Sequence, residues 1–382
     1  MTQFQIAKTD PARTRLIEMT PEDYAASIGE GDVLVRVDRF GLSSNNITYV
    51  VLGDRFGYWK FFPAAPGQDD GGGEGPEEWG VMPVWGFGDV VESRCDNVEV
   101  GERLFGYFPP ATHLVMHPDP SRPSESPVLD ASAHRENLPL SYNTYERVLQ
   151  EPNYDPADDN LRMLLNPLQI TAWALWQAMR EAEWFAAEQV VIVSASSKTG
   201  LGLAQALKRD QTSPEIVGLT SSKNRDFIVS LDLYDRVVTY DEIEESLPPR
   251  PSVVVDMAGS GAVLGRVHRH LGQAMLRSLN VGLTHWDEAG GGTDIIRERS
   301  EMFFAPGVIE ERMKQWGAAE FTRQTREFLT RAFDESRGWL TIETVQGLDG
   351  MEAKYAAVRD GSLAPDRGII VSPDQGLDAA LQ

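Results

Sequence analysis

The sequence predicts an α/β protein of two domains, one rich in β-strands and the other built on a doubly wound parallel sheet. At 382 residues the chain exceeds the length that one compact core usually holds. Short strands separated by glycine turns occupy residues 31–107, whereas fully apolar strands alternate with helical stretches from residue 189 to about residue 285. Apolar runs without polar alternation are typical of strands covered on both faces, and hence of a parallel sheet.

The composition restricts the partners that the chain can bind. It carries 35 basic and 58 acidic residues, a net charge of −23, which argues against binding nucleic acid or an anionic membrane through bulk charge. A small anionic ligand would need a local basic pocket. Cys95 is the single cysteine, which excludes an internal disulfide and a multi-cysteine zinc site. The first residues lack the apolar stretch of a signal peptide, and no apolar run has membrane-spanning length, so we expect a cytoplasmic protein.

The N-terminal part reads as a small, curved antiparallel sheet. Apolar segments at 33–37, 89–92 and 103–106 each follow a glycine-containing turn. Two insertions interrupt the pattern and are expected to be loops. Residues 66–80 hold six glycines and five carboxylates, and residues 118–127 are rich in Pro and Ser.

Helical periodicity begins after this region. Apolar residues recur at three- and four-residue spacings over 161–180, where Pro167 is expected to separate two helices. The C-terminal part predicts a long helix near 309–336, a strand near 340–345, a helix near 351–359 and a last strand at 368–371.

Between these regions lies an alternation of strands and helices typical of a dinucleotide-binding sheet. After the first strand, a polar loop containing Ser196 leads into Lys198-Thr199-Gly200-Leu201-Gly202, where a helix is expected to start. A pyrophosphate binds at such a helix N-terminus because the macrodipole is positive there and glycine lets the backbone come close. The full Gly-x-Gly-x-x-Gly pattern is absent, and a glycine-rich turn without a ligand remains the alternative. The expected strands are 190–193, 216–219, 237–238, 253–255 and 279–281.

The end of the second strand favours one cofactor over the other. An NAD site carries a carboxylate here, about 20 residues after the last glycine, whereas this chain has Thr220-Ser221-Ser222-Lys223-Asn224-Arg225. Hydroxyls and two cations suit the 2′-phosphate of NADP, which is dianionic. A solvated helix start capped by serine is the alternative.

Other chemistries find little support. His113, His117 and His134 fall in one region with Asp119 and Asp130 nearby, but Pro118 argues against the helix that would align the first two as metal ligands. A metal hydrolase built on these residues is therefore the weakest hypothesis, and we expect no metal. Cys95 has no evident base beside it, and the Gly-x-Ser-x-Gly motif of hydrolases is absent. His268 and His270, in a predicted helix, are expected to be exposed.

Taken in order, the segments resemble the medium-chain dehydrogenase/reductase superfamily, and most closely its zinc-free, quinone-oxidoreductase-like branch. The resemblance implies a GroES-like β-rich catalytic domain (1–165), a Rossmann nucleotide-binding domain (166–305) and a C-terminal return to the catalytic domain (306–382). No catalytic zinc is implied, because Leu42-Ser43-Ser44 and Gly86-Phe87-Gly88 stand where zinc-dependent members carry a cysteine and a histidine. The matching segments are 31–43, 83–93, 100–107, 170–175, 189–225, 254–260, 281–284 and 356–371.

The resemblance also implies site residues. Thr171 matches the threonine beside the nicotinamide, and Val281 with Gly282 matches the strand whose main chain contacts the carboxamide. Asn46 or Ile47 stands where relatives carry an acidic or polar residue, and Tyr49 and Tyr58 are candidate proton donors, with packing as the alternative role. An aromatic pocket of Tyr49, Tyr58, Trp59 and Trp85 is expected, with the 66–80 loop as a lid. The expected NADP(H) ligands are Thr171, Ser196, Lys198, Thr199, Gly200, Gly202, Ser221, Ser222, Lys223, Arg225, Val281 and Gly282.

The leading functional hypothesis is a zinc-independent, NADP(H)-dependent oxidoreductase that transfers hydride to a quinone or an α,β-unsaturated carbonyl compound. The alternative is a protein that keeps this fold, has lost efficient hydride transfer, and serves as a small-molecule-binding or interaction protein. Lys198-Thr199 stands where relatives have glycine, which favours the alternative. A homodimer is expected by resemblance.

Overall fold

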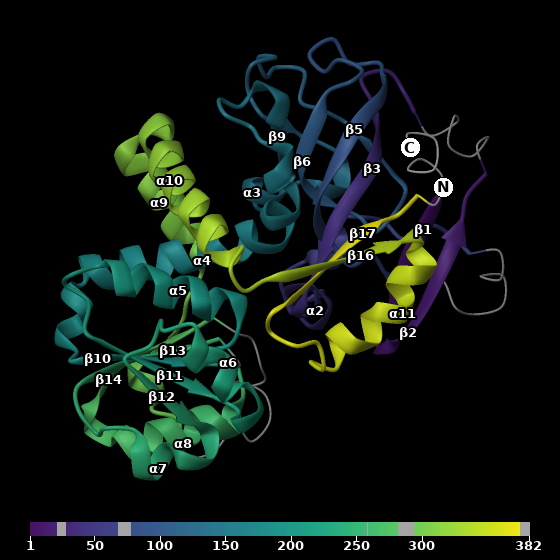
Figure 1. The fold of residues 1–382 in the computed structure, drawn as a ribbon. Helices are drawn as coiled ribbons and strands as arrows, with labels where there is room; N and C mark the ends of the chain where they lie inside the picture. Colours follow the sequence, from purple (N-terminus) through teal and green to yellow (C-terminus); the bar gives the residue numbers. More distant parts are fainter. Residues whose placement is uncertain (21–27, 68–77, 258, 282–293, 375–382) are drawn as a thin grey trace. The chain divides into compact units, whose positions relative to one another are not determined.

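The computed structural model describes residues 1–20, 28–67, 78–257, 259–281 and 294–374 (Figure 1). The chain divides into two compact units. The first joins Met1–Leu164 to Leu340–Gln382, and the second comprises Leu165–Trp339. The C-terminal segment therefore rejoins the first unit at Leu340 and not at 306, where the sequence analysis had placed the return.

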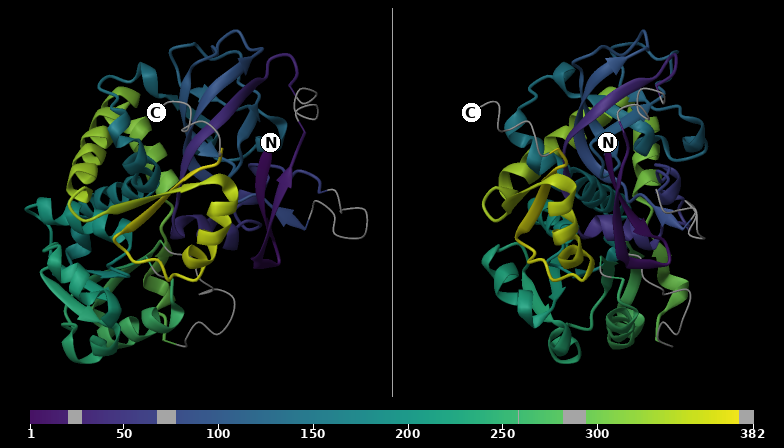
Figure 2. Two further views of the ribbon diagram at one scale, coloured as in Figure 1. Left: turned by 45° about the vertical axis from the view of Figure 1, so that its right-hand side comes forward. Right: turned by 90° about the vertical axis from the view of Figure 1, so that its right-hand side faces the viewer.

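The first unit contains a mostly antiparallel sheet in the strand order β16-β17-β3-β5-β6-β9-β8, with β7 pairing with β3, and a smaller sheet in the order β2-β1-β4. The strand β17 pairs antiparallel with β3, with Ile370 opposite Gly41, which is how the C-terminus completes the N-terminal sheet (Figure 2). The strands are β1(Thr2–Ala7), β2(Asp10–Glu18), β3(Val33–Leu42), β4(Trp79–Gly80), β5(Val84–Ser93), β6(Arg103–Phe108), β7(His113–Met116), β8(Val128–Leu129), β9(Thr144–Arg147), β16(Thr341–Gln346) and β17(Arg367–Ser372).

Helices of the first unit connect or cover these strands. They are α2(Ser44–Val51), α3(Leu140–Asn143) and α11(Gly347–Arg359). The helix α11 links β16 to β17, which run parallel, and it buries Met351, Tyr355 and Val358 in the core of this unit. The strands expected near 33–37, 89–92, 103–106, 340–345 and 368–371 and the helix near 351–359 are all present.

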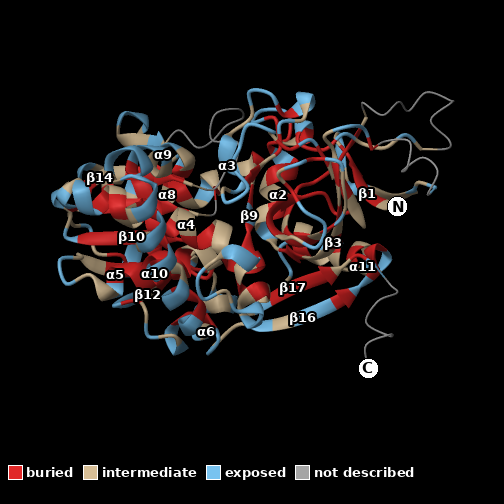
Figure 3. Ribbon diagram, turned by 90° about the horizontal axis from the view of Figure 1, so that it is seen from above, coloured by how far each residue is buried: buried red, intermediate tan, exposed pale blue. Residues whose placement is uncertain are grey.

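The second unit is an open sheet in the order β12-β11-β10-β13-β14-β15, with every pair parallel. This is the order 3-2-1-4-5-6 of the doubly wound dinucleotide-binding fold, so the predicted fold class is confirmed. The central strand β10 is buried along its whole length (Figure 3), as expected for a run of Val and Ile covered on both faces. The strands are β10(Gln189–Val193), β11(Glu215–Thr220), β12(Arg236–Thr239), β13(Ser252–Asp256), β14(Met275–Asn280) and β15(Ser300–Met302).

Helices cover both faces of this sheet. One apolar cluster joins α4(Asp159–Glu181), α5(Lys198–Arg209) and α6(Arg225–Ser230) to the face that carries Val190 and Ile192. A second cluster joins α7(Ile243–Ser246) and α8(Gly261–Leu271) to the opposite face, which carries Val191 and Val193. Alternate residues of one strand thus supply two cores.

The C-terminal helices of the second unit differ from the expectation. Instead of one helix near 309–336, the structure has α9(Ala305–Trp316) and α10(Ala318–Ser336), separated by Gly317 at φ 79°. A glycine adopts this left-handed conformation without the strain that a side chain would cause. Phe321 and Phe328 of α10 pack with Trp173 of α4, which is why this segment groups with the second unit.

Pro167 does not separate two helices, contrary to the expectation. The helix α4 continues through it. Proline has no N–H, so the carbonyl of Met163 loses its helical donor there. Four residues later, the Thr171 hydroxyl donates to the carbonyl of Pro167 at 3.0 Å. In the described part of the chain, no helix is long and apolar enough to cross a membrane.

Candidate functional site

The strand order of the second unit reverses between β10 and β13. The chain leaving β10 turns to one face of the sheet and the chain leaving β13 turns to the other, and in sheets of this order ligands bind at the carboxyl ends of the strands at this point. Val193 and Asp256, the last residues of the two strands, lie side by side in register. This edge is therefore the candidate site.

A tight turn follows β10. Ser194 adopts a positive φ of 60°, an uncommon conformation for a residue with a side chain. The carbonyl of the next residue, Ala195, accepts a hydrogen bond from the Tyr234 hydroxyl at 2.7 Å. Ser197 then caps α5 by accepting from the Gly200 N–H at 3.1 Å. The positive end of the α5 dipole is thereby fixed at the carboxyl edge of the sheet.

The two glycines of this turn lack a side chain for different structural reasons. A Cβ on Gly200 would lie 2.9 Å from Ser197 Oγ and 3.1 Å from the Ser194 carbonyl oxygen, so the tight turn itself needs glycine. A Cβ on Gly202 would lie 2.0 Å from Oε1 of Gln169, on α4. The second glycine thus packs directly against the buried amide of Gln169, a contact that α5 and α4 make without a ligand. Lys198 and Thr199 occupy the first turn of α5.

The loops after β10 and β11 are joined directly. Asn224 Nδ2 donates to the buried Ser196 Oγ at 3.0 Å. Ser196 therefore lies at the boundary between the two loops, where the sequence analysis expects a cofactor ligand. Asn224 was not among the expected site residues, although its place between Lys223 and Arg225 was a usable signal.

Cations and hydroxyls lie at the end of β11, as the cofactor prediction requires. Lys223 and Arg225 are exposed, and Ser221 is half-buried beside them. Ser222 Oγ donates to Asp241 Oδ2 at 3.3 Å, so its hydroxyl is partly engaged. Lys223 makes no ion pair with any residue that the structure describes. Arg225 Nη1 lies 4.0 Å from Asp226 Oδ1, and both cations are exposed.

Two of the residues expected beside the nicotinamide, Thr171 and Val281, already use polar groups in hydrogen bonds within the protein. The Thr171 hydroxyl is bonded to the Pro167 carbonyl within α4, as described above. The N–H of Val281 donates to the Asp256 carbonyl at 2.9 Å and extends the edge of the sheet. Gly282 lies outside the described residues.

Two buried polar side chains at this edge, Asp256 and Asn280, were missed by the sequence analysis, and His268 on α8 was wrongly expected to be exposed. The carboxylate of Asp256 accepts from the Gly259 N–H at 3.0 and 3.1 Å. Asn280, at the end of β14, is paired in register with Asp256 and is equally buried. His268 is fully buried on α8, contrary to its expected exposure, because β14 and the segment around Ile296 cover it. His270 is half-buried, and its ring nitrogen Nε2 lies 2.7 Å from the Leu247 carbonyl oxygen.

In the first unit, Asn46 of the three candidate catalytic residues belongs to a helix cap. Asn46 is buried and caps α2, since its Oδ1 accepts from the Ser43 N–H at 2.8 Å and its Nδ2 donates to the Pro83 carbonyl at 3.0 Å. Both ends of its amide are therefore used in holding the fold. This placement favours a structural role over contact with a substrate.

Tyr49 and Tyr58 lie together, with ring centroids 4.7 Å apart. The Tyr49 oxygen accepts from Asn45 Nδ2 at 2.7 Å and from Trp85 Nε1 at 3.2 Å. Burial raises the pKa of the Tyr49 hydroxyl far above its usual range, and it raises that of Tyr58 as well. Both phenols therefore keep their protons, and Tyr58 is the more accessible of the two.

The expected aromatic pocket is partly a packed core. Trp59 is buried between Gly53 and Gly80, where a Cβ would come within 2.0 Å and 2.4 Å of its ring. Trp85 instead packs on Tyr107, with centroids 5.3 Å apart, and bonds to Tyr49. Residues 68–77 of the expected lid lie outside the described part of the chain.

The histidines considered as metal ligands have separate partners. His117 Nδ1 lies 2.7 Å from Asp32 Oδ1, His113 lies beside Thr112, and His134 Nε2 lies 3.1 Å from the Phe61 carbonyl oxygen. Among the described residues no group of His, Cys, Asp or Glu side chains could hold a metal ion. Cys95 is buried and donates to Asn97 Oδ1 at 2.8 Å.

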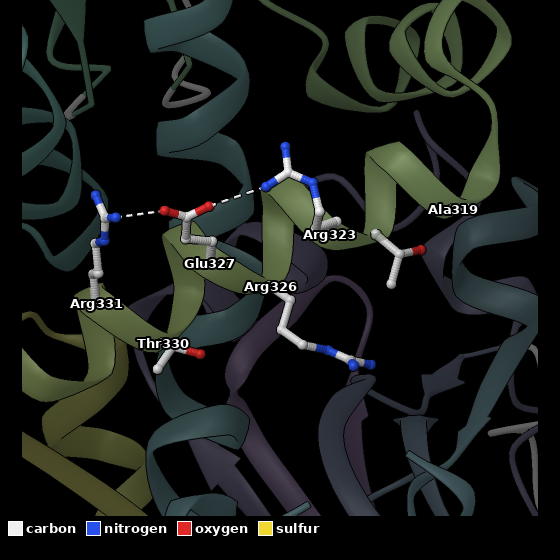
Figure 4. A pocket seen from close by; sticks show the side chains of 7 residues that line it. Ala319, Arg323, Arg326, Glu327, Thr330 and Arg331 are labelled. Atoms are coloured by element: carbon white, nitrogen blue, oxygen red, sulfur yellow. Dashed lines mark hydrogen bonds and ion pairs between the residues drawn. The ribbon is translucent and has the colours of Figure 1, made fainter. Parts of the chain in front are cut away.

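A separate hollow of about 490 Å³ lies along α10 (Figure 4). Its lining comes from α10 alone and includes a ladder in which Glu327 pairs with both Arg323 and Arg331. Such pairs, four residues apart, are ordinary on a solvated helix face. None of the candidate site residues lines this hollow.

A sheet in the order 3-2-1-4-5-6 and a β-rich unit completed by the C-terminus together define the medium-chain dehydrogenase/reductase fold. Within it, the chain belongs to the family described as "Protein of unknown function (DUF2855)", which matches residues 40–364. No curated protein matches the chain in sequence.

Solved structures share this fold at low sequence identity. CurA from Vibrio vulnificus in complex with NADPH is 13% identical with a TM-score of 0.61, over 98% of this chain and 100% of that one. YhdH of E. coli K-12 with bound NADPH is 15% identical with a TM-score of 0.56, over 98% and 100%. A mutant enoyl thioester reductase from Candida tropicalis is 12% identical with a TM-score of 0.55, over 97% and 99%.

Proposed function

We propose that this protein is an NADP(H)-dependent oxidoreductase that reduces a small molecule with an activated double bond or a quinone. The observation that carries the proposal is the end of β11, where Lys223 and Arg225 are exposed beside Ser221 and where an NAD site would present a carboxylate. The solved structures with this fold that hold NADPH or NADP support the same cofactor.

The residues at the carboxyl edge fit this cofactor. The N-terminus of α5 would hold the pyrophosphate, and Lys223 with Arg225 would hold the 2′-phosphate. Asn280 adds a buried amide nitrogen that has no acceptor among the described residues, on the far side of the switch point. When bound, NADPH supplies hydride to the substrate.

A proton must then reach the reduced product, and Tyr58 is the candidate donor. Its hydroxyl keeps its proton because burial raises its pKa, and it is less enclosed than Tyr49. Tyr49 packs against it and orients the ring. Donation by a phenol whose pKa is well above neutral is slow unless the accepting atom is strongly basic, as an enolate is.

One set of observations favours the alternative, a protein of this fold that binds a small molecule without efficient turnover. Asn46 is used for capping and the Tyr49 oxygen already accepts two hydrogen bonds, so neither offers a free catalytic group.

Fluorescence or calorimetric titration with NADPH and NADH tests the proposal. We expect saturable NADPH binding, and the absence of binding by either nucleotide at millimolar concentration contradicts it. Turnover of NADPH with a panel of quinones and enones then separates the two hypotheses: binding without oxidation of NADPH supports the alternative.

A further inference from the structure

A buried chain of three polar side chains ends at the candidate site. His268, on α8, and Ser278 and Asn280, on β14, are each at most 1% exposed. The two β14 residues are two positions apart and therefore point to the same face of the sheet, the face that α8 covers. His268 Nε2 lies 3.1 Å from Ser278 Oγ, and Ser278 Oγ lies 3.1 Å from Asn280 Oδ1.

The donor and acceptor of each hydrogen bond among these three side chains can be assigned from the N–H group of Ile296. The N–H of Ile296 donates to His268 Nδ1 at 3.1 Å, so Nδ1 carries no proton. Burial lowers the pKa of His268 to about 4, with a smaller contribution from the charge of Arg299, and the ring is neutral near pH 7. Its proton therefore lies on Nε2, which donates to Ser278 Oγ.

Assigning the bond between Ser278 and Asn280 in the same way leaves the Asn280 Nδ2 donor without an acceptor among the described residues. Because Ser278 Oγ receives the histidine proton, its own hydroxyl proton is available to Asn280 Oδ1, which can only accept. The Asn280 side chain is thereby fixed with its carbonyl toward Ser278 and its Nδ2 turned away. That nitrogen is buried and has no acceptor among the described residues. A buried donor without an acceptor is unfavourable, so a site that keeps one is expected to receive an acceptor from its ligand.

The position of Asn280 indicates which part of the ligand supplies the acceptor. The adenosine half of a dinucleotide lies over β10 and β11, where Lys223 and Arg225 are found, and the other half lies across the switch point over β13 and β14. Asn280 is the last residue of β14 and is paired with Asp256 of β13. That half also carries phosphate and ribose oxygens, and the carbonyl oxygen of the nicotinamide carboxamide is its terminal acceptor for an N–H donor.

We propose that Asn280 binds the nicotinamide carboxamide by donating from Nδ2 to its carbonyl oxygen, and that Ser278 and His268 are positioning residues that hold the amide in this orientation. The inference rests on the proposed function, since it requires that NADP(H) binds at this edge. It goes further by giving a side chain, and not only main-chain groups, the task of orienting the nicotinamide ring.

The test compares two ligands that share the adenosine half. NADPH carries the nicotinamide, and 2′,5′-ADP does not. In Asn280→Asp, which keeps the shape but replaces the donor with an acceptor, we expect NADPH affinity to fall at least about tenfold while 2′,5′-ADP affinity stays within about twofold. In Ser278→Ala, which lets the amide rotate, NADPH affinity is expected to fall about fivefold, again without a change for 2′,5′-ADP.

A matched control loses a buried serine hydroxyl elsewhere in the same unit. Ser336 is fully buried on α10 and donates to the Ala332 carbonyl at 2.6 Å. Ser336→Ala is expected to leave both affinities unchanged. If Asn280→Asp fails to bind 2′,5′-ADP because it does not fold, Asn280→Ala and Ser278→Ala decide the question by the same comparison.

The outcomes separate the two proposals. Unchanged NADPH affinity in the Asn280 and Ser278 variants, or a parallel loss of both ligands, overturns this inference and leaves the proposed function standing. Failure of the unaltered protein to bind either ligand overturns the proposed function, and this inference with it. Selective loss of NADPH supports both.

Discussion

Gly202 of α5 lies directly against the side-chain amide of Gln169 on α4, so that a Cβ on the glycine would come within 2.0 Å of Gln169 Oε1. Both polar atoms of this amide are buried without a partner among the described residues. The glycine that looks most like part of a nucleotide fingerprint is therefore held by helix packing. The structural role of Gly202 can therefore be tested by stability measurements without any ligand.

Gly202→Ala is expected to destabilise the second unit by about 1–3 kcal/mol, because the methyl group overlaps Gln169 in a packed interior. Denaturant unfolding measures this. Gly265 of α8 is the matched control, since a Cβ there would meet nothing nearer than 3.9 Å, and Gly265→Ala should be neutral or slightly stabilising. In a Gln169→Ala background the cost of Gly202→Ala should largely disappear; an undiminished cost would show that Gln169 is not its cause.

Removing the two cations at the end of β11 should change cofactor preference. In Lys223→Ala/Arg225→Ala we expect NADPH affinity to fall about 10- to 100-fold and NADH affinity to change little, because only NADPH carries the 2′-phosphate. Lys208→Ala/Arg236→Ala removes two exposed cations elsewhere in this unit, which pair with Asp235 and Glu215, and controls for net charge. Equal losses for NADPH and NADH would refute the 2′-phosphate assignment.

Tyr49→Phe should reduce stability more than it reduces chemistry. It leaves Asn45 Nδ2 and Trp85 Nε1 without their acceptor, at an expected cost of about 1–3 kcal/mol in the free energy of unfolding. Tyr355 also belongs to the core of the first unit, but its buried hydroxyl has no partner among the described residues, so Tyr355→Phe should be close to neutral. A Tyr49→Phe protein of unchanged stability that no longer turns over would make Tyr49, and not Tyr58, the proton donor.

Because the imidazole of His268 is buried, the free energy of unfolding should decrease as the pH falls. Its pKa in the folded state is lowered to about 4 from 6.5, so between these values the unfolded chain binds the extra proton and the folded protein does not. The stability that neutral His268 contributes is complete above pH 6.5 and decreases as the pH falls toward 4, by up to about 3 kcal/mol.

Unfolding titrations at several pH values check this for the protein and for His268→Gln, which cannot titrate. The variant should take up about one proton fewer on unfolding in this window. Identical pH slopes for the two proteins would mean that His268 does not keep its lowered pKa. Arg299, whose charge also lowers that pKa, is unaltered in both proteins.

The local pattern determined much of the fold. The runs of Val and Ile at β10, β11 and β13 could only be strands covered on both faces, and the turn at Gly101 precedes β6. Gly86 and Gly88, expected in a turn, instead lie inside β5. The identities of Lys223 and Arg225 are visible in the sequence, and their place at a strand end follows from the length of one βαβ unit.

Where the sequence analysis was wrong, either a long-range contact or the local backbone conformation decided the outcome. The helix α4 passes through Pro167, although proline usually ends a helix, and its apolar residues pack on the sheet and on α5. Helix breaking at Gly317 depended on a backbone conformation that composition does not reveal. His268 has the sequence context of a polar residue on an exposed helix face, and only the tertiary structure shows that β14 and Ile296 cover it.

The sequence by itself determined the class of fold and the chemistry available at the edge of the parallel sheet, because strand periodicity and residue identity are local properties. Only the tertiary structure decided which polar groups are free. Asn46 is bonded to Pro83, 37 positions away, and His268 to Ile296, 28 positions away, so neither assignment can be made from neighbouring residues. Hydrogen bonds made across the fold engage the Asn46 amide with the Pro83 carbonyl and leave Asn280 Nδ2 without an acceptor among the described residues.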